Sequence, residues 1–450
     1  MPEQASEFDV IVVGAGPAGE TVASRRCARG MRTALVEREL LGGECAYWAC
    51  IPSKTLLRPG ELLGEAERTA GTARPAQRFD EIASYRDFMV RDHADTDEAK
   101  GYAERGVRVY RGAARFAGSG SVEVGDELLG AERIVIATGS EPVIPDIPGL
   151  EATGYWTNRE ATSMRGMPAS ACVLGGGPVG VELAQMLHRF GAQVHLIDQR
   201  SRLLAREDER VSELLLDALR DDGIRVNLCA EIASVEVRGG ERVVNFGEDT
   251  VHCEQLVVAS ARRPRIAGLA LESAGIAATE AGIVVDERCR AGDGVWAVGD
   301  VTGVMPFSHV AMYQARVACA DILGEPARAD YSAVPRAVFC DPEVAAVGRT
   351  ERQAREEGID VVLARVVLRD TIARPWTYET DARGELTVIA DRERRVLVGA
   401  WAVAPLASEW IHYAALAIKA ELPISLLTDT VAQFPTYTEA FLKALEQLEL

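Results

Sequence analysis

Two segments of this sequence share one pattern: a short apolar run, a glycine-rich turn, a helical stretch, and a second apolar run that ends in an acidic residue. The first has the turn GAGPAG, whose glycines are Gly14, Gly16 and Gly19, and it closes at Glu37. Glycines permit a tight turn, and the N-terminus of the following helix favours a phosphate. The segment is therefore predicted to bind a dinucleotide, with Glu37 accepting hydrogen bonds from ribose hydroxyls.

The second segment has the turn GGGPVG, with Gly175, Gly177 and Gly180, and it closes at Asp198. The first glycine and the closing acid are 23 residues apart in both segments (14 to 37 and 175 to 198). A single glycine motif predicts little, but two motifs in full strand–turn–helix–strand context predict two separate dinucleotide sites. Two purely structural turns are the alternative, and the matched spacing argues against it.

Composition narrows the class of protein. A chain of 450 residues predicts about three domains. The net charge of −19 disfavours nucleic acid and anionic membrane surfaces as partners. The N-terminus has no signal-peptide pattern and no apolar run is long enough to cross a bilayer, so a cytoplasmic protein without membrane contact is expected. The nine cysteines form no regular framework, so structural disulfides are not expected, and no metal site is predicted.

The segment GGECAYWACIPSK, residues 42–54, contains Cys45 and Cys50 with four residues between them. At this spacing the two sulfurs approach bonding distance only if the start of the helix is distorted. The preceding glycines, Gly43 among them, let the backbone come close to a flat ligand, and a helix N-terminus favours a thiolate. The segment predicts a redox-active disulfide held against a cofactor; two unrelated cysteines are the alternative.

Other parts of the chain add weaker signals. The segment ERIVIATGS is a strand running into a turn at Thr138 and Gly139, and GVWAVGD is a strand that ends at Asp300. Asp300 is placed where a strand end meets a ligand, and a structural turn aspartate is the alternative. Helices are predicted over residues 61–68 and 85–105. From about residue 335 the pattern becomes strand-rich, with two further helices.

The two glycine motifs, the cysteine pair before Pro-Ser-Lys, and the late strand ending in Gly-Asp together resemble the pyridine nucleotide-disulfide oxidoreductases. These flavoproteins include dihydrolipoamide dehydrogenase, glutathione reductase and mercuric reductase. The resemblance covers essentially the whole chain and implies an α/β fold with two Rossmann-like dinucleotide-binding domains and a C-terminal α+β dimerisation domain. The implied bounds are 1–150 with 276–334 for the FAD-binding domain, 151–275 for the NAD(P)-binding domain, and 335–450 for the dimerisation domain. A homodimer is implied, with the active site completed by the partner's C-terminal segment.

The resemblance also implies roles for single residues. Cys50 would be the cysteine nearer the flavin, Cys45 the thiol that attacks the substrate, and Lys54 a residue near the flavin paired with Glu182. FAD would be bound by Gly14, Gly16, Gly19, Glu37, Gly43, Thr138, Gly139 and Asp300. NAD(H) or NADP(H) would be bound by Gly175, Gly177, Gly180 and Asp198.

The choice between the two nicotinamide nucleotides depends on charge. Asp198 favours the free 2′-hydroxyl of NADH and repels a 2′-phosphate. Arg200 and Arg202 follow closely and could hold that phosphate. We expect NADH to be preferred.

The sequence departs from the family at its C-terminal motif. Family disulfide reductases have a His-Pro-Thr segment and a glutamate three residues after the threonine, and the histidine protonates the leaving thiol. Here the segment is AQFPTYTEAF, with Phe434 in the histidine position and Glu439 retained. Phenylalanine cannot transfer a proton, so reduction of a substrate disulfide should be impaired. Tyr437 and His412 are substitutes only by proximity in sequence; packing is the expected role of both.

Further differences concern other family activities and residues. In the family, mercuric reductases and large-type thioredoxin reductases use a C-terminal cysteine pair. The segment KALEQLEL has no such pair, which disfavours both activities. Glu439 is expected to be structural. His309 aligns with the family's helix near the flavin and is expected to pack there.

Three hypotheses follow. The first is an NAD(P)H oxidoreductase that passes electrons through FAD and Cys45–Cys50 to a small-molecule acceptor of a non-standard kind: a quinone, a dye, a metal ion or an unusual disulfide. The second is a dihydrolipoamide dehydrogenase-like reductase of small disulfides. The third is a flavin-bearing assembly or regulatory subunit whose activity is vestigial.

Overall fold

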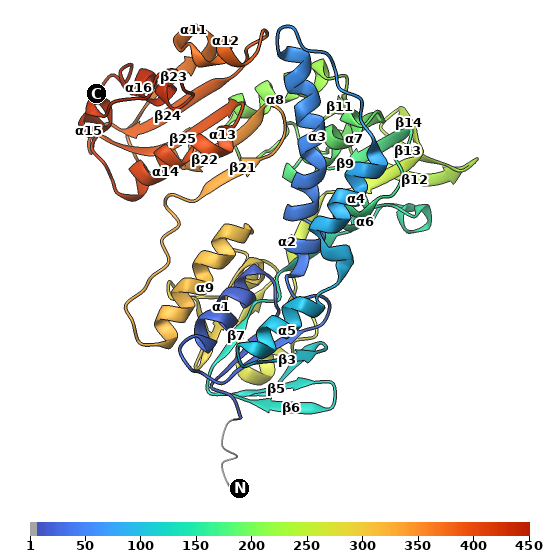
Figure 1. Ribbon diagram of the computed structural model, residues 1–450, viewed down its shortest axis with the longest axis vertical. Helices are drawn as coiled ribbons and strands as arrows, with labels where there is room; N and C mark the ends of the chain where they lie inside the picture. The colour runs from blue at the N-terminus through green and yellow to red at the C-terminus, as the bar shows by residue number, and fades with distance from the viewer. Residues whose placement is uncertain (1–6) are drawn as a thin grey trace. The chain divides into compact units, whose positions relative to one another are not determined.

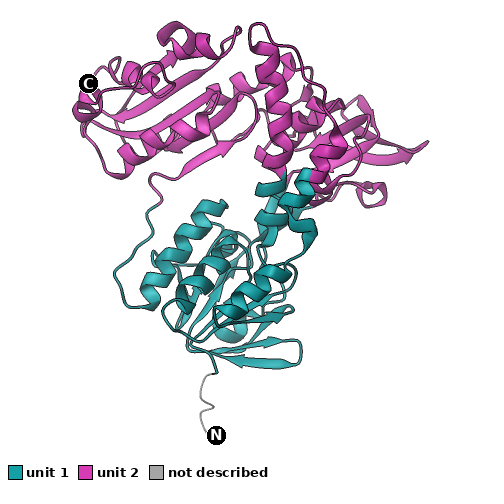
Figure 2. Ribbon diagram, viewed as in Figure 1, with its two compact units in different colours: residues 1–52, 85–143, 261–330 teal, residues 53–84, 144–260, 331–450 magenta. Residues whose placement is uncertain are grey.

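The computed structural model describes residues 7–450, and the chain divides into two compact units (Figure 2). Unit 1 is drawn from residues 1–52, 85–143 and 261–330, and unit 2 comprises residues 53–84, 144–260 and 331–450. Each unit is assembled from three segments that are distant in the sequence.

A six-stranded sheet forms the centre of unit 1, in the order β19–β20–β7–β1–β2–β3. Its neighbouring strands are parallel, except that β19 is antiparallel to β20. The strands are β1 (Val10–Val13), β2 (Thr33–Glu37), β3 (Val107–Arg111), β7 (Ile134–Ile136), β19 (Arg290–Gly292) and β20 (Val295–Ala297). Val10 and Val12 of β1 enter one core, whereas Ile11 and Val13 enter another on the opposite face. Burial on both faces is typical of a parallel sheet covered on two sides.

Helices α1 (Pro17–Cys27), α5 (Thr96–Glu104) and α9 (Ser308–Ile322) contribute to the first of these cores (Figure 1). The other face is covered by an antiparallel sheet of β4 (Ala114–Gly118), β5 (Ser121–Val124) and β6 (Glu127–Gly130). Smaller elements of unit 1 are α2 (Gly43–Tyr47), η1 (Arg91–His93), β8 (Ser140–Val143), β16 (Ala261–Pro264), η3 (Leu271–Ala274), β17 (Ala278–Thr279), β18 (Gly282–Ile283) and η4 (Asp300–Thr302).

Two helices differ from the sequence prediction. Helix α3 (Cys50–Arg68) begins well before the predicted start at residue 61. Pro59, a residue that normally interrupts a helix, lies inside it. The single helix predicted over residues 85–105 is wrong. Helix α4 (Phe79–Met89) ends within this range, at Met89, and α5 starts only at Thr96. Residues 91–93 between them have positive φ angles of 52°, 49° and 56°, which a right-handed helix cannot contain.

Unit 2 contains a second parallel sheet, in the order β11–β10–β9–β15. Its strands are β9 (Ser170–Leu174), β10 (Gln193–Ile197), β11 (Arg225–Asn227) and β15 (Gln255–Val258). Helices α7 (Pro178–Arg189) and α8 (Glu209–Asp221) pack on one face. An antiparallel sheet of β12 (Ile232–Arg238), β13 (Glu241–Phe246) and β14 (Asp249–Cys253) covers the other. Short elements before this sheet are η2 (Leu150–Thr153) and α6 (Asn158–Ser163).

The C-terminal part of unit 2 is a five-stranded antiparallel sheet, in the order β21–β22–β25–β24–β23. Its strands are β21 (Pro335–Val338), β22 (Glu343–Gly348), β23 (Val361–Val367), β24 (Glu385–Asp391) and β25 (Val396–Ala404). The helices of this part are α10 (Glu351–Glu356), α11 (Leu368–Thr371), α12 (Arg374–Tyr378), α13 (Ala407–Trp410), α14 (His412–Lys419), α15 (Ile424–Asp429) and α16 (Glu439–Leu445). The α/β class and the α+β C-terminal region are as predicted. Across residues 7–450, no helix has both the length and the apolar character needed to cross a membrane.

Candidate active site

The first glycine motif forms the turn between β1 and α1. Gly14 has φ 99°, and a Cβ there would lie 2.4 Å from the Ala137 carbonyl oxygen. A Cβ on Gly19 would lie 1.8 Å from the Gly14 carbonyl oxygen, so α1 packs directly on the turn. By contrast, a Cβ on Gly16 would meet nothing within 4 Å. The turn is thus closed toward the sheet and open beside the N-terminus of α1, which suits a diphosphate.

The second glycine motif repeats this geometry between β9 and α7. A Cβ on Gly175, whose φ is 119°, would lie 2.5 Å from the Ala259 carbonyl oxygen. A Cβ on Gly180 would lie 1.8 Å from the Gly175 carbonyl oxygen, and one on Gly177 would meet nothing within 4 Å. The two motifs predicted from spacing therefore have the same close approaches and the same open position.

The acids that close the two motifs brace the turns. Glu37 Oε2 accepts a hydrogen bond from the Ala15 backbone N–H at 2.7 Å. Asp198 Oδ2 accepts one from the Gly176 backbone N–H at 2.5 Å, and its other oxygen accepts from the Arg200 N–H at 2.7 Å. Both side chains are buried. Each acid thus has a structural role in addition to the predicted contact with a ribose.

Arg200 and Arg202 differ in whether their guanidinium groups bind other parts of the fold. Arg202 donates to the backbone carbonyl oxygens of Glu207 at 2.8 Å and Ala205 at 2.9 Å. Arg200 is exposed. Because the Arg202 guanidinium is used within the fold, Arg200 is the arginine left to contact a 2′-phosphate.

The cysteine pair lies where one helical path is interrupted. Cys45 is on α2, which ends at Tyr47, and Cys50 is the first residue of α3. Trp48, between the helices, has φ −135° and ψ 0°, which is not helical. This interruption is the distortion that the four-residue spacing requires. Gly43 packs on the first glycine motif, since a Cβ there would lie 2.8 Å from Gly16 Cα.

The two sulfurs share one hydroxyl neighbour. Ser308 Oγ, at the start of α9, donates to Cys45 Sγ at 3.3 Å and lies 3.3 Å from Cys50 Sγ. Both cysteines are free thiols and half-buried. The hydrogen bond with Cys50, and then burial, raise the pKa of Cys45, while the hydrogen bond with Ser308 acts in the opposite direction. Ser308 was not predicted; it is 258 residues from Cys50 in sequence, and no local pattern marks it.

A polar network in unit 1 includes the predicted residue Asp300. Ser140 Oγ donates to Asp300 Oδ2 at 2.6 Å and accepts from Arg262 Nε at 2.9 Å. The Thr138 hydroxyl donates to the Arg265 carbonyl oxygen at 2.7 Å. Gly139 has φ 72°. Sequence reasoning missed Ser140 and Arg262, which fix the position of Asp300.

Lys54 and Glu182 form an ion pair within unit 2. Lys54 Nζ lies 2.8 Å from Glu182 Oε2 and 4.6 Å from the centre of the Phe339 ring. Glu182 is buried, and its other oxygen accepts from the Phe339 backbone N–H at 3.0 Å. The pairing inferred from the resemblance is present; its role beside a flavin stays a prediction.

The C-terminal motif has an exposed ring and one buried carboxylate oxygen that lacks a hydrogen-bond partner. Phe434 is 70% exposed. Glu439 Oε2 is buried without a hydrogen-bond partner among the described residues. The Tyr437 ring is buried and stacks on Trp410 with 6.1 Å between ring centres, so it packs as expected. Burial raises the pKa of Tyr437, which makes it a poor proton donor near neutral pH.

Both histidines for which the sequence predicts a packing role lie on helices. His412 is exposed at the start of α14. His309 is exposed and stacks on Phe307 with 5.3 Å between ring centres.

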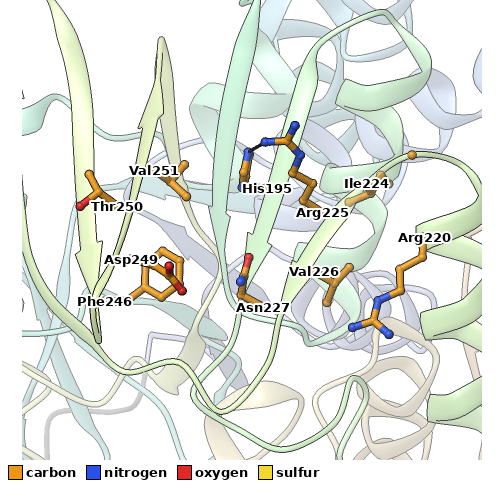
Figure 3. A pocket seen from close by; sticks show the side chains of 11 residues that line it. His195, Arg220, Ile224, Arg225, Val226, Asn227, Phe246, Asp249, Thr250 and Val251 are labelled. Carbon is orange, nitrogen blue, oxygen red and sulfur yellow. Dashed lines mark hydrogen bonds between the residues drawn. The ribbon is translucent and has the colours of Figure 1, made fainter.

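A surface pocket of about 500 Å³ in unit 2 contains none of the predicted site residues (Figure 3). It lies between strands β10 and β11 and the β13–β14 hairpin. Arg225 Nη1 is 3.3 Å from His195 Nε2 at its edge. Burial, and then the charge of Arg225, lower the pKa of His195.

Comparisons with known proteins agree with the fold and the motifs. The family model "Pyridine nucleotide-disulphide oxidoreductase" matches residues 8–315, and the model of that family's dimerisation domain matches residues 334–445. The probable pyridine nucleotide-disulfide oxidoreductase RclA of Escherichia coli is 32% identical over 448 residues, covering 97% of this chain and 98% of that protein. A dihydrolipoyl dehydrogenase of Thermus scotoductus is 33% identical over 455 residues, covering 98% and 97%.

The names of two further matches refer to metal ions. A mercuric reductase of Acidithiobacillus ferrooxidans is 32% identical over 450 residues, covering 96% of this chain and 81% of that protein. A solved Cu(II) complex of RclA, described as an HOCl-induced flavoprotein disulfide reductase from Escherichia coli, has a TM-score of 0.87 at 30% identity, covering 98% and 99%. The chain therefore belongs to the pyridine nucleotide-disulfide oxidoreductase family, whose members are enzymes that use FAD and NAD(P)H.

Proposed function

We propose that this enzyme passes electrons from NAD(P)H through FAD and the Cys45–Cys50 pair to an acceptor other than a small disulfide. The observation that carries the proposal is the C-terminal motif. Phe434 stands where the resemblance places a proton-donating histidine, and a buried oxygen of Glu439 has no hydrogen-bond partner within residues 7–450. The thiol pair, by contrast, keeps its hydroxyl contact within unit 1.

In the proposed site, separate groups of residues bind FAD, bind the nicotinamide nucleotide and transfer electrons to the acceptor. The first glycine motif, Glu37, Gly43, Thr138, Gly139 and Asp300 would hold FAD, and the second glycine motif with Asp198 would hold the nicotinamide nucleotide. When bound, FAD would supply the redox chemistry that links a hydride donor to a disulfide. Cys50 is the first residue of α3, whose N-terminus favours a thiolate, so Cys50 would hold the thiolate and Cys45 would meet the acceptor.

A thiophilic metal ion is the acceptor class that we favour. Soft thiolate ligands select soft metal ions, and reducing a bound metal ion requires no proton from the protein. RclA has been solved as a Cu(II) complex, and several relatives are mercuric reductases. The metal ion in this proposal is a substrate, not a resident cofactor. Quinones, dyes and an unusual disulfide are the other acceptors to be compared.

An acceptor panel tests the proposal. The FAD-loaded enzyme is given NADH and, in turn, Cu(II), a benzoquinone, lipoamide or glutathione disulfide. We expect turnover of Cu(II) or quinone to exceed that of both disulfides, and Cys45→Ser to abolish Cu(II) reduction. Cys229→Ser is the matched control, because Cys229 is an exposed free thiol outside the pair. Faster turnover of lipoamide than of every other acceptor contradicts the proposal.

A dihydrolipoamide dehydrogenase-like reductase is the second candidate. It is favoured by the 33% identity to a dihydrolipoyl dehydrogenase over nearly the full length of both chains. The same panel separates the two candidates. The third hypothesis, a subunit with vestigial activity, is disfavoured because the relatives are oxidoreductases. A homodimer and a cytoplasmic location complete the proposal.

A further inference from the structure

One hydroxyl contacts both reacting sulfurs. Ser308 Oγ donates to Cys45 Sγ at 3.3 Å and is 3.3 Å from Cys50 Sγ. A serine hydroxyl has one proton and two lone pairs. While it donates to one sulfur, it can therefore accept a hydrogen bond from the S–H group of the other.

Two helix N-termini meet at the same sulfurs. Helix α3 begins at Cys50, and helix α9 begins at Ser308. The positive ends of the two helix dipoles favour negative charge on the pair. The nearest acid in sequence, Glu44, is paired with Arg265 at 3.4 Å, which limits its repulsion of a thiolate.

We propose that Ser308 carries the proton of the reduced Cys45–Cys50 pair from one sulfur to the other and donates a hydrogen bond to whichever sulfur is the thiolate. This inference rests on the proposed redox role of the pair. A disulfide that takes up two electrons and one proton becomes one thiol and one thiolate. Ser308 receives the thiol proton of Cys45 and gives its own hydroxyl proton to the Cys50 thiolate. The negative charge then lies on Cys45, and no proton enters or leaves.

This relay would generate the Cys45 thiolate although Phe434 stands in the position of the family's proton-transferring histidine. Cys45 holds its proton tightly because the hydrogen bond with Cys50 and burial both raise its pKa. A phenylalanine cannot remove that proton. Transfer through Ser308 to Cys50 produces an attacking thiolate on Cys45 without any external base, which suits an acceptor that requires no proton in return.

The test compares side chains at position 308 in the full FAD-loaded chain. The pair is reduced with a phosphine, the reductant is removed, and alkylation of Cys45 by iodoacetamide is followed by peptide mass spectrometry at pH 6 to 9. We expect Ser308→Ala to lower the Cys45 rate at pH 7 roughly tenfold, because a hydrogen bond to the thiolate is lost. Ser308→Thr should stay within about twofold of the unchanged protein. Ser273→Ala is the matched control, since that hydroxyl donates to backbone carbonyls at 3.0 and 2.8 Å.

Equal Cys45 alkylation rates in Ser308→Ala and the unchanged protein overturn the inference. If Ser308→Ala does not fold, Ser308→Thr and Ser308→Val decide, because these two side chains have the same shape and differ in the hydroxyl; equal rates again overturn it. Failure of the proposed function shows differently. In that case lipoamide is turned over faster than every other acceptor, or Cys45→Ser retains full acceptor turnover, whatever the alkylation rates are.

Discussion

Asp198 is a buried side chain that braces the fold, and we expect it to set nucleotide specificity as well. Its carboxylate is fixed by the backbone N–H groups of Gly176 and Arg200. A fixed negative charge at the end of β10 would repel the 2′-phosphate of a nucleotide bound there, and a repulsive group of this kind is an effective source of specificity. Of the two arginines that could offset it, Arg202 is used by backbone carbonyls.

The enzyme is therefore expected to have a higher kcat/KM for NADH than for NADPH. Asp198→Ser should lower the ratio of the two values roughly tenfold, about 1.4 kcal/mol, because it removes the repulsion. Steady-state kinetics with both nucleotides measures the ratio, and Arg200→Ala should have the opposite effect, lowering kcat/KM for NADPH. A preference of the unchanged enzyme for NADPH would show that Asp198 does not set the specificity.

Glu343 predicts a pH dependence of stability. Burial raises its pKa from 4.5 to about 7, against the opposing hydrogen bond from the Ser408 backbone N–H. The folded state therefore binds a proton that the unfolded state releases above pH 4.5. The contribution of Glu343 to stability is complete below that pH and declines as the pH rises through about 7.

Between pH 4.5 and 7.5, the free energy of unfolding should fall by about 3 kcal/mol more in the unchanged protein than in Glu343→Gln. Urea denaturation at several pH values measures both proteins. Parallel pH profiles for the two would mean that Glu343 ionises normally in the fold.

At the scale of elements, the glycine motifs and their strands could be predicted because close backbone approach leaves a local signature in the sequence. The start of α3 at Cys50 could not, because Pro59 and Gly60 normally argue against a continuing helix. Ser308 could not be found either, since its contact with the cysteines is set by the packing of α9 in unit 1. The glutamate left by the missing histidine was visible in the sequence, but the burial of its Oε2 atom required the structure.

Helix α3 is attached to the C-terminal part of unit 2 by Arg68. Its guanidinium is 2.8 Å from Asp341 and 2.5 Å from Glu379, and both carboxylates are largely buried. Arg58, on the same helix, pairs with Glu61 and Glu65 at an exposed position. The two arginines therefore offer a matched comparison.

Arg68→Met should lower the free energy of unfolding by about 3–5 kcal/mol, because it leaves the buried Glu379 carboxylate unpaired, whereas Asp341 keeps its ion pair with Arg189 at 2.8 Å. Arg58→Met should cost less than about 1 kcal/mol, as for other exposed ion pairs. Chemical denaturation measures both. Equal losses in the two variants would indicate that burial of the Arg68 pairs is not what stabilises this contact.

At the scale of the whole molecule, the C-terminal region carries the family's dimerisation domain. Its strongly exposed apolar side chains in the single chain include Leu416, Leu426, Val431 and Phe434, at 66%, 50%, 94% and 70%. Apolar surface of this kind is typical of an interface.

Sedimentation should show a dimer of twice 48.5 kDa, about 97 kDa. Val431→Asp should shift it toward monomer, because a charge would be buried without a partner. Val237→Asp is the matched control, since Val237 is 51% exposed on the β12 strand outside that domain. A monomer in the unchanged protein would contradict the homodimer.

On the proposed function, an intact thiol pair lacks the proton donor needed to reduce a small disulfide. The most direct measurement is lipoamide turnover by the unchanged enzyme and by Phe434→His, with Glu439 available to orient the new imidazole. General acid–base help is typically worth about 10²–10⁴-fold, so we predict low turnover in the unchanged enzyme and a gain of at least tenfold in the variant. Rapid lipoamide reduction by the unchanged enzyme, with no gain from the histidine, would contradict the claim.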